Sequence, residues 1–463
     1  MCPRDWCLSF MVVGMKTISA GKVASWAAWD WGSAAFNAVA TTFVFSVYLT
    51  ADNMFTDSAT ANRVLSWGMT IAGLAVALLA PANGYRADKS GRGVRSVGVF
   101  SFLVFLCLVA MFFVTPGSFK MLVFGVVLLG LGNIFFEFAS VNYNGMLNYV
   151  STPKNRGTIS GIGWGAGYIG GIILLLILYF GFINPEVGLF GVTGENGMDI
   201  RISMLIAAVW FGVFAIPVLV NPPDGYDANR TGETTSIVSA YRGVFRDIAG
   251  LWRHSRSTLG FLIASAVFRD GLAGVFTFGG VIAGSVFGFS PSEVIMFAIA
   301  ANVVAGVSTI GLGKLDDAVG PKIVISASLV TMVIAAIAIF MLHSNGQVVF
   351  WTLGLLLCVF VGPCQSASRT MLARMIPEGR EGEIFGLYAT TGRAVSFVSP
   401  MFYGLAITIG GAVVGDSADA TYWGILGIAL VLLIGFFLLL PVKAKKMNAN
   451  GIDGDAPLEA ASL

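Results

Sequence analysis

Twelve long apolar stretches, separated by shorter polar segments, set the pattern of this chain. Each has roughly the 20 residues that a helix needs to cross the hydrocarbon core of a bilayer. Within that core every backbone N–H and C=O must be paired inside the protein, and long continuous runs favour helices over the short alternating strands of a barrel. The predicted spans are 24–50, 63–83, 94–114, 119–145, 157–182, 201–221, 258–288, 293–313, 322–342, 347–373, 382–412 and 421–441.

The composition explains what surrounds these stretches. Of the 463 residues, 56% are apolar and only 11% are charged, whereas an ordinary soluble domain carries about a quarter charged residues. Lipid must therefore face most of the surface, which excludes a cytosolic enzyme and a disordered chain. The 27 Lys and Arg against 25 Asp and Glu give a net charge of +2, so no basic footprint for nucleic acid is present. We predict an all-α polytopic membrane protein.

The cations predict the orientation of the spans, because loops on the cytoplasmic side carry an excess of Lys and Arg. If the N-terminus is inside, 21 of the 27 cations fall in cytoplasmic segments. Both termini are then cytoplasmic and the number of spans is even. The predicted divisions are a tail at 1–22, a six-helix bundle at 23–221, a linker at 222–257, a second six-helix bundle at 258–441 and a tail at 442–463.

The linker contains one segment with helical periodicity. Its apolar positions fall on one face of a helix, and three arginines lie among them in the sequence. Two placements stay open: a helix lying at the cytoplasmic membrane surface, or a helix packed on the bundle. The apolar positions are Ile237, Tyr241, Val244, Phe245, Ile248 and Trp252, and the cations are Arg242, Arg246 and Arg253.

Two loops repeat one pattern at an offset close to half the chain. Gly84 is followed by Asp four residues later, Gly three after that and then a cation; the same order begins at Gly313, 229 residues further on. A second echo links 153–156 with 377–380, at an offset of 224 residues. Two matches at nearly one offset indicate two six-span halves with the same orientation, which is the arrangement of parallel transporter repeats.

The first of these loops resembles the loop motif of the major facilitator superfamily, Gly-x-x-x-Asp-(Arg/Lys)-x-Gly-Arg-(Arg/Lys). Gly91 permits a tight turn with positive φ, and Asp88 can cap a helix N-terminus. The resemblance implies the major facilitator fold and a conformational latch between the two halves on the cytoplasmic side. The latch positions are Gly84, Asp88, Lys89, Gly91 and Arg92, with Gly313, Asp317, Gly320 and Lys322 in the second half.

Shorter segments resemble signatures of the "unknown major facilitator" family, which includes a yeast autophagy-related vacuolar amino-acid effluxer. Within them, Trp29, Gly32 and Arg269 depart from the usual family letters. The resemblance implies an amino-acid-like solute. The segments are 29–36, 269–271, 365–369 and 385–388 with 392–393.

Six ionisable residues fall inside predicted spans, where charge is costly and usually lines a cavity or pairs with another charge. Five lie on spans 1, 4, 7 and 10, which by resemblance line the central path. Helical spacing adds amides to the same faces. The candidate substrate-binding and translocation residues are Asp30, Asn37, Asn133, Glu137, Asn144, Arg269, Asp270, Gln365, Arg369 and Arg393.

Roles within this set follow from side-chain chemistry. Glu137 and Asp270 are the predicted proton-responsive carboxylates, because burial and a nearby Arg shift carboxylate titration in opposite directions. Arg269 or Arg369 would hold a substrate carboxylate through two hydrogen bonds. Two other readings stay open: Asp30 and Arg369 could snorkel or pair with a loop, and the charges could serve as structural ion pairs between the repeats.

The leading prediction is a secondary transporter that moves a small polar solute by alternating access, either alone or coupled to protons, with export as plausible as uptake. The alternatives are efflux of drugs or organic anions, or a scaffold or receptor without transport.

Neither the five cysteines nor His254 and His343 have metal-site spacing, so no metal or cofactor is expected. The glycine run at 161–171 opens an apolar helix rather than following a strand, so we expect helix packing and not nucleotide binding. We expect a protein of the plasma membrane that is a monomer. We do not expect an enzyme, because the sequence shows no cluster of nucleophile, base or metal ligands.

Overall fold

The computed structural model describes residues 18–51, 54–227, 236–289, 291–377, 379–415, 420–443, 445–447 and 453–457. Within them, twelve helical segments are long and apolar enough to cross a membrane, as the hydropathy pattern predicts. Some predicted features lie outside the described residues. They are residues 1–17 of the N-terminal tail, Arg230, and the side chains of Ile237, Phe245 and His254.

The first half runs from α1 to α8. Its elements are α1 (Ala20–Ala34), the π-helix η1 (Ala35–Phe43), α2 (Phe45–Thr50), α3 (Ser58–Ser90), α4 (Gly93–Met111), α5 (Phe119–Gly145), α6 (Leu147–Val150), α7 (Arg156–Leu178), the π-helix η2 (Tyr179–Ile183), the 3₁₀ turns η3 (Leu189–Gly191) and η4 (Glu195–Gly197), and α8 (Met198–Val220).

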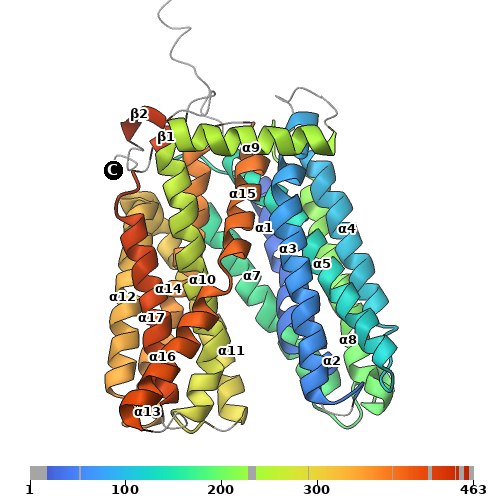
Figure 1. The fold of residues 1–463 in the computed structure, drawn as a ribbon. Coiled ribbons are helices and arrows are strands. Elements are labelled where there is room, and N and C mark those ends of the chain that lie inside the picture. The colour runs from blue at the N-terminus through green and yellow to red at the C-terminus, as the bar shows by residue number, and fades with distance from the viewer. Residues whose placement is uncertain are drawn as a thin grey trace, which may run out of the picture.

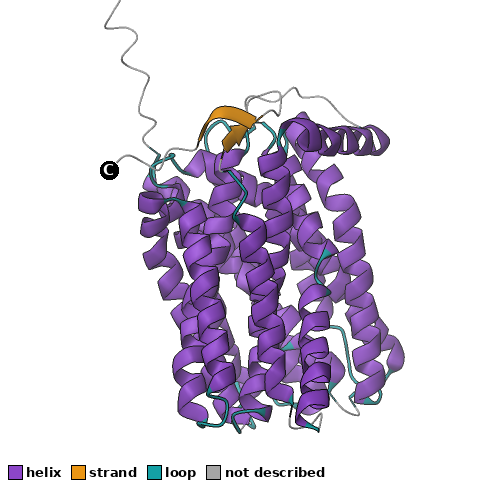
Figure 2. Cartoon of the chain, turned by 60° about the vertical axis from the view of Figure 1, so that its left-hand side comes forward, coloured by secondary structure: helices purple, strands orange, loops and turns teal. Residues whose placement is uncertain are grey.

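The second half follows the linker helix α9 (Ile237–His254). Its elements are α10 (Arg256–Ser285), α11 (Pro291–Val319), α12 (Pro321–Met341), α13 (Gln347–Val349), the π-helix η5 (Phe350–Gly354), α14 (Leu355–Met375), α15 (Glu381–Ala394), α16 (Val398–Val414), the 3₁₀ turn η6 (Thr421–Trp423) and α17 (Gly424–Leu439). Two short strands, β1 (Lys445–Met447) and β2 (Asp453–Pro457), pair antiparallel beyond the bundle (Figure 2).

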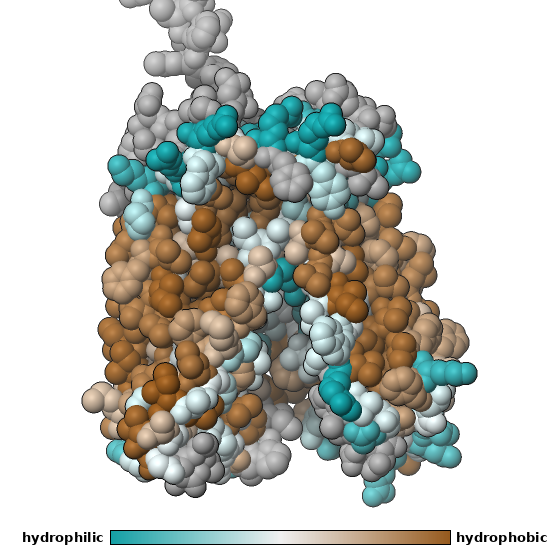
Figure 3. Space-filling model, in the orientation of Figure 1, coloured by the Kyte–Doolittle hydropathy of each residue, from teal (hydrophilic) through white to brown (hydrophobic). Residues whose placement is uncertain are grey.

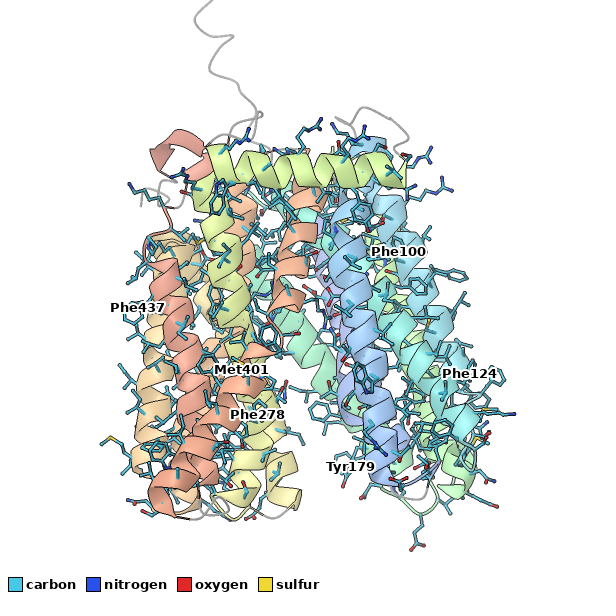
Figure 4. All side chains as sticks on the ribbon, in the orientation of Figure 1. Phe100, Phe124, Tyr179, Phe278, Met401 and Phe437 are labelled. Atoms are coloured by element: carbon cyan, nitrogen blue, oxygen red, sulfur yellow. The ribbon has the colours of Figure 1, made fainter. Side chains whose placement is uncertain are left out.

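The two halves stand side by side, meeting at one end and separating toward the other (Figure 1). At the end where α9 and the strands lie, α3 packs on α15 and α7 packs on α11; we call this the closed end. Toward the opposite, open end the surface is hollowed between the halves (Figure 3). The outer faces are apolar, and the exposed Phe124 and Phe437 project from opposite sides of the bundle (Figure 4).

Glycines allow the helices of the two halves to touch at the closed end. A Cβ on Gly84 of α3 would overlap the carbonyl group of Gly382 at the start of α15. A Cβ on Gly161 of α7 would lie 2.6 Å from the Thr309 carbonyl oxygen of α11, closer than van der Waals contact allows. These helix pairs therefore meet backbone to backbone, and a larger side chain would force them apart.

The expected packing role of the glycine run in α7 is confirmed. Gly163, Gly167 and Gly171 all face α1: their added Cβ atoms would meet Trp26, the backbone of Asp30 and Ala34 respectively. The small-residue face therefore brings span 5 close to span 1 within the first half.

The linker helix packs on the bundle, where its placement had been left open. Ala240, Val244 and Leu251 are buried, and the Tyr241 hydroxyl donates a 3.0 Å hydrogen bond to the Leu78 carbonyl of α3. Trp252, expected on the same apolar face, is instead 66% exposed. The packed face therefore includes Ala240 and Leu251 beside the predicted Val244, and leaves out Trp252.

Span 11 is not the continuous helix predicted at 382–412. It consists of α15 and α16, separated at 395–397. Pro400 lies in the first turn of α16, where the missing N–H does no harm. The break falls at mid-span, close to several of the candidate residues.

Candidate functional site

Asp88 lies at the closed end and joins the two halves. Its carboxylate accepts hydrogen bonds from the backbone N–H groups of Gly382 (3.1 Å) and Glu383 (2.8 Å), the first turn of α15. A carboxylate at this position satisfies N–H groups that have no partner within the helix and opposes the positive end of the helix dipole. The aspartate of one half therefore caps a helix of the other.

Asp317 repeats this arrangement from the second half. It accepts hydrogen bonds from the N–H groups of Gly157 (2.6 Å) and Thr158 (2.7 Å) at the start of α7. Arg374 of α14 lies 3.2 Å from the same carboxylate. The internal repeat thus appears in space as two reciprocal caps, one in each direction across the interface.

Among the other predicted latch positions, Gly84 and Gly313 face the backbone of the opposite half, at Gly382 and Gly157; the remaining five make turns or contacts within their own half. Gly91 and Gly320 have φ values of +62° and +89°, which glycine adopts without strain. Lys89 lies over the Tyr85 ring, 5.8 Å from its centroid. Lys322 donates to the carbonyl oxygens of Leu440 and Val442 after α17. Arg92 precedes α4, and its carbonyl accepts the N–H of Ser96.

Arg369 forms the next layer toward the centre. It is 2% exposed and reaches from α14 into the first half, where Nη1 lies 3.2 Å from Asp30 Oδ2 and 3.2 Å from Asn144 Oδ1. Nε and Nη2 donate to the hydroxyl (3.0 Å) and carbonyl (2.6 Å) of Ser160 in α7. The guanidinium carbon also lies 5.0 Å from the ring centroid of Trp26. In this conformation the protein itself satisfies Arg369.

Glu137, Asn133 and Arg393 form the layer nearest the cleft. Arg393 of α15 is paired with Glu137 of α5 and donates a 3.3 Å hydrogen bond to Asn133. The side chains of Arg393 and Glu137 are 32% and 23% exposed, unlike the sealed Arg369 layer. This pair is therefore an inter-half contact that a solute entering the cleft can reach.

Arg269 and Asp270, adjacent on α10, face different partners. Arg269 lies 3.8 Å from the centroid of the Tyr388 ring and donates to the Tyr388 carbonyl (3.2 Å). Asp270 accepts the N–H of Ser399 (2.6 Å), and its own carbonyl accepts the Ser399 hydroxyl (2.9 Å). Asp270 thereby caps α16 where span 11 is broken. It stays a candidate for proton coupling, with its contacts inside the second half.

Asn37 and Gln365 lie on the open-end side of the Asp30–Arg369 layer, one on span 1 and one on α14. Asn37 is exposed and lies seven residues beyond Asp30 on span 1. It belongs to the π-helix η1, and its carbonyl accepts the hydroxyls of Thr41 and Thr42. Gln365 is half-buried, one turn from Arg369. π-Helical segments are often found at functional sites.

Sequence reasoning missed several members of these layers. Ser160 and Glu381 carry no signal that separates them from other polar residues in helices, since their partners come from distant spans. Tyr388 falls in the signature-like segment 385–388, but nothing in the sequence points to its contact with Arg269. Tyr149 of α6, for example, donates to Glu381 across the interface (3.2 Å). The cation bias places Arg374 among the cytoplasmic cations, and the structure shows it buried and facing two aspartates. Among the described residues, no group of three or more His, Cys, Asp or Glu could hold a metal.

Comparison with known proteins places these features in a family. Residues 149–450 match the family model described as "Vacuole effluxer Atg22 like". An uncharacterised MFS-type transporter of Bacillus subtilis, YxiO, is 24% identical over 94% of this chain and 98% of its own length. Autophagy-related protein 22 of Cryptococcus neoformans is 22% identical, and the match covers 64% of this chain and 54% of that protein. The chain thus spans about half the length of this fungal relative.

Solved structures confirm the fold. The proton:xylose symporter XylE bound to a bromo-deoxyglucose has a TM-score of 0.66 with 13% identity, covering 89% of this chain and 94% of that one. A bacterial homologue of ferroportin in an outward-facing state has a TM-score of 0.64 with 14% identity, covering 91% and 98%. The relatives are transporters, so the prediction that the chain is not an enzyme is confirmed. This multi-pass membrane protein belongs to the Atg22-like vacuole effluxer family and has the major facilitator fold.

Proposed function

We propose that this transporter moves a small zwitterionic solute of the α-amino-acid type by alternating access, and that it binds the solute between Glu137 and Arg393. The observation that carries the proposal is the partly exposed ion pair that these residues form across the two halves. It is an inter-half ion pair whose two side chains are both partly exposed.

An amino acid offers the charges that this pair already uses. The guanidinium of Arg393 suits a carboxylate, which it can bind with two hydrogen bonds. The carboxylate of Glu137 suits an ammonium group. Asn133, whose side-chain oxygen lies 3.3 Å from Arg393, adds a second acceptor beside it. A bound zwitterion would replace the direct Arg393–Glu137 contact, and with it one link between the halves. Binding would then favour the conformations in which the halves separate at the closed end.

A proton could act at the same place. A proton and the solute ammonium group would compete for Glu137, because protonation removes the charge that holds Arg393 and that would bind the ammonium. We propose Glu137 as the coupling carboxylate on this ground. Asp270 is a second candidate, which would act through the cap of α16 rather than through the solute.

We propose that the closed end faces the cytoplasm and that both termini lie there. The cation bias supports this orientation, because the linker helix α9 and the loop cations after α3 lie at the closed end. The bacterial relative matched over nearly its whole length supports placement in the plasma membrane. The cleft is formed within one chain, which is consistent with a monomer.

The orientation can be tested with single cysteines and a membrane-impermeant maleimide on intact cells. Lys314→Cys, at an exposed position of the closed end, is expected to react only after the membrane is permeabilised. Asn345→Cys, exposed between α12 and α13 at the open end, is expected to react without permeabilisation. The opposite pattern would reverse the orientation.

Substrate class can be tested by thermal-shift binding on detergent-purified protein. We expect zwitterionic amino acids to stabilise the protein, and organic anions or cations that lack one of the two charges to do so more weakly. Glu137→Gln and Arg393→Gln are each expected to weaken binding about 10- to 100-fold, because a hydrogen bond to a charged group contributes about 1.5–3 kcal/mol.

Arg63→Gln is the matched control, since it removes an exposed cation at the open end that donates a hydrogen bond to Thr60 of the same helix. Binding of organic anions in preference to zwitterions, retained in Glu137→Gln and lost in Arg393→Gln, would favour an organic-anion transporter instead.

A further inference from the structure

The two reciprocal caps differ at one buried position. Ala87 precedes the capping Asp88 in the first half, whereas Asp316 precedes the capping Asp317 in the second. Ala87 is 5% exposed and Asp316 is 2% exposed. The cap made by Asp88 forms with a methyl group at the neighbouring position, so helix capping alone does not require the second carboxylate.

Asp316 lies in a setting that does not satisfy its charged form. Neither carboxylate oxygen accepts a hydrogen bond of normal geometry. The Thr370 hydroxyl of α14 lies near the carboxylate but donates to the Ser366 carbonyl, at 3.1 Å. Arg374 Nη2 is 3.6 Å from Asp316 Oδ1 and is closer, at 3.2 Å, to Asp317 Oδ1. The Nε of Arg374 also lacks an acceptor. One guanidinium is therefore shared between two adjacent carboxylates, with the better geometry given to Asp317.

The surroundings of Asp316 come from three helices. From α7, a Cβ added to Gly157 would lie 2.7 Å from the Asp316 Cβ, so the start of that helix covers the carboxylate. The charged groups that face Asp316 are Arg374 of α14, Asp317 of α11 itself and Arg156 of α7. Burial and the adjacent Asp317 disfavour a charged Asp316, whereas the two arginines favour it.

Opening of the closed end would reverse this balance. When α7 separates from α11, Gly157 no longer covers the carboxylate and water can solvate it. A charged carboxylate that is buried without hydrogen bonds is strongly disfavoured, and two carboxylates that share one cation bind a proton more readily than either would alone. The two conformations therefore differ in their affinity for a proton at this position.

We propose that Asp316 is a proton-binding site of the closed end, which takes up a proton when α7 and α11 come together and releases it when they separate. The proposal rests on the alternating access proposed above. It differs from coupling at Glu137, because the proton here binds in the interface that must open and not in the solute site. A lower pH then favours the closed conformation of this end, since that conformation holds one more proton.

The test measures the conformation of the closed end directly. Spin labels on Lys154→Cys before α7 and Ala318→Cys near the end of α11, both exposed, report their separation by pulsed electron resonance in nanodiscs. The background carries Cys2→Ser and Cys7→Ser, since the described cysteines Cys107, Cys358 and Cys364 are buried. The ratio of short-distance to long-distance populations is followed from pH 8 to pH 5.

With Asp316 present, we expect this ratio to rise as the pH falls, by up to about tenfold per pH unit, which is the limit for one linked proton. In Asp316→Asn, which keeps the shape of a neutral carboxyl, we expect a high ratio at every pH. Asp316→Ala, which restores the residue of the first half, is the second variant and should also lose the pH dependence.

Two outcomes would overturn the proposal: no pH dependence with Asp316 present, or the same dependence in Asp316→Asn and Asp316→Ala. The readout needs no solute, so it is separate from the proposed function. If no amino acid binds while Asp316→Asn still abolishes the pH dependence, the solute assignment fails and the proton site stands.

Discussion

Replacing Arg369 with alanine is expected to shift the closed end toward its open conformation by about 100-fold or more. The substitution leaves Asp30 buried without a cation, and breaking a buried ion pair in this way costs about 3–5 kcal/mol. The hydrogen bonds to Asn144 and Ser160 are lost as well. In the open conformation water would solvate Asp30, so the loss falls mainly on the closed one. The spin-label pair at Lys154 and Ala318 measures the shift.

Two further variants separate charge from geometry at this position. Arg369→Lys keeps the charge but cannot reach Asp30, Asn144 and Ser160 together, so it should recover only part of the closed population. The double variant Asp30→Asn with Arg369→Gln leaves no unpaired buried charge in this layer and should be less open than Arg369→Ala. A closed population that is unchanged in Arg369→Ala would show that this layer does not hold the halves together.

The second prediction concerns the reciprocal caps. Asp88→Asn and Asp317→Asn each keep an acceptor oxygen but lose the charge and one of two hydrogen bonds to the opposite half. Each is expected to lower the closed-to-open ratio by about 5- to 30-fold, which corresponds to about 1–2 kcal/mol for a helix cap. The caps lie on different helix pairs, so the effects in the double variant should multiply. The same spin labels report the ratio.

Asp57→Asn is the matched control for the caps. Asp57 also caps a helix, accepting the N–H of Thr60 at the start of α3 (2.8 Å), and these bonds lower the pKa of its carboxyl. It lies at the open end and contacts its own half, so the closed-to-open ratio should not change. If Asp57→Asn shifted the ratio as much as Asp88→Asn, the effect would reflect general stability and not a latch.

Much of the fold could be predicted because it depends on local patterns. Apolar length fixed the twelve spans, and the repeated loop around Asp88 and Asp317 identified the two halves. The break in span 11 was missed, since the segment around 395–397 is as apolar as its flanks and its cap, Asp270, comes from span 7. Pro400 was the available signal, because a proline suits the first turn of a helix better than its interior.

The site was predicted as a set of residues but not as a set of contacts. The polar faces on spans 1 and 4 predict that Asp30, Asn133 and Glu137 avoid lipid, and all three contact arginines of the second half. Their partners could not be read from the sequence, because Arg369 and Arg393 are separated from them by more than half the chain and their pairing depends on how the halves dock. For the same reason the backbone contact between Gly84 and Gly382 had no signal beyond the glycines themselves.

The central claim is that a zwitterionic solute crosses the membrane through the Glu137–Arg393 site. Counterflow in proteoliposomes tests it most directly: vesicles loaded with one unlabelled amino acid are diluted into a trace of its labelled form. We predict transient accumulation of label with the unsubstituted protein and with Arg63→Gln, and none with Glu137→Gln or Arg393→Gln. Accumulation that is equal in all four proteins, or absent for every amino acid while an organic anion accumulates, would contradict the account.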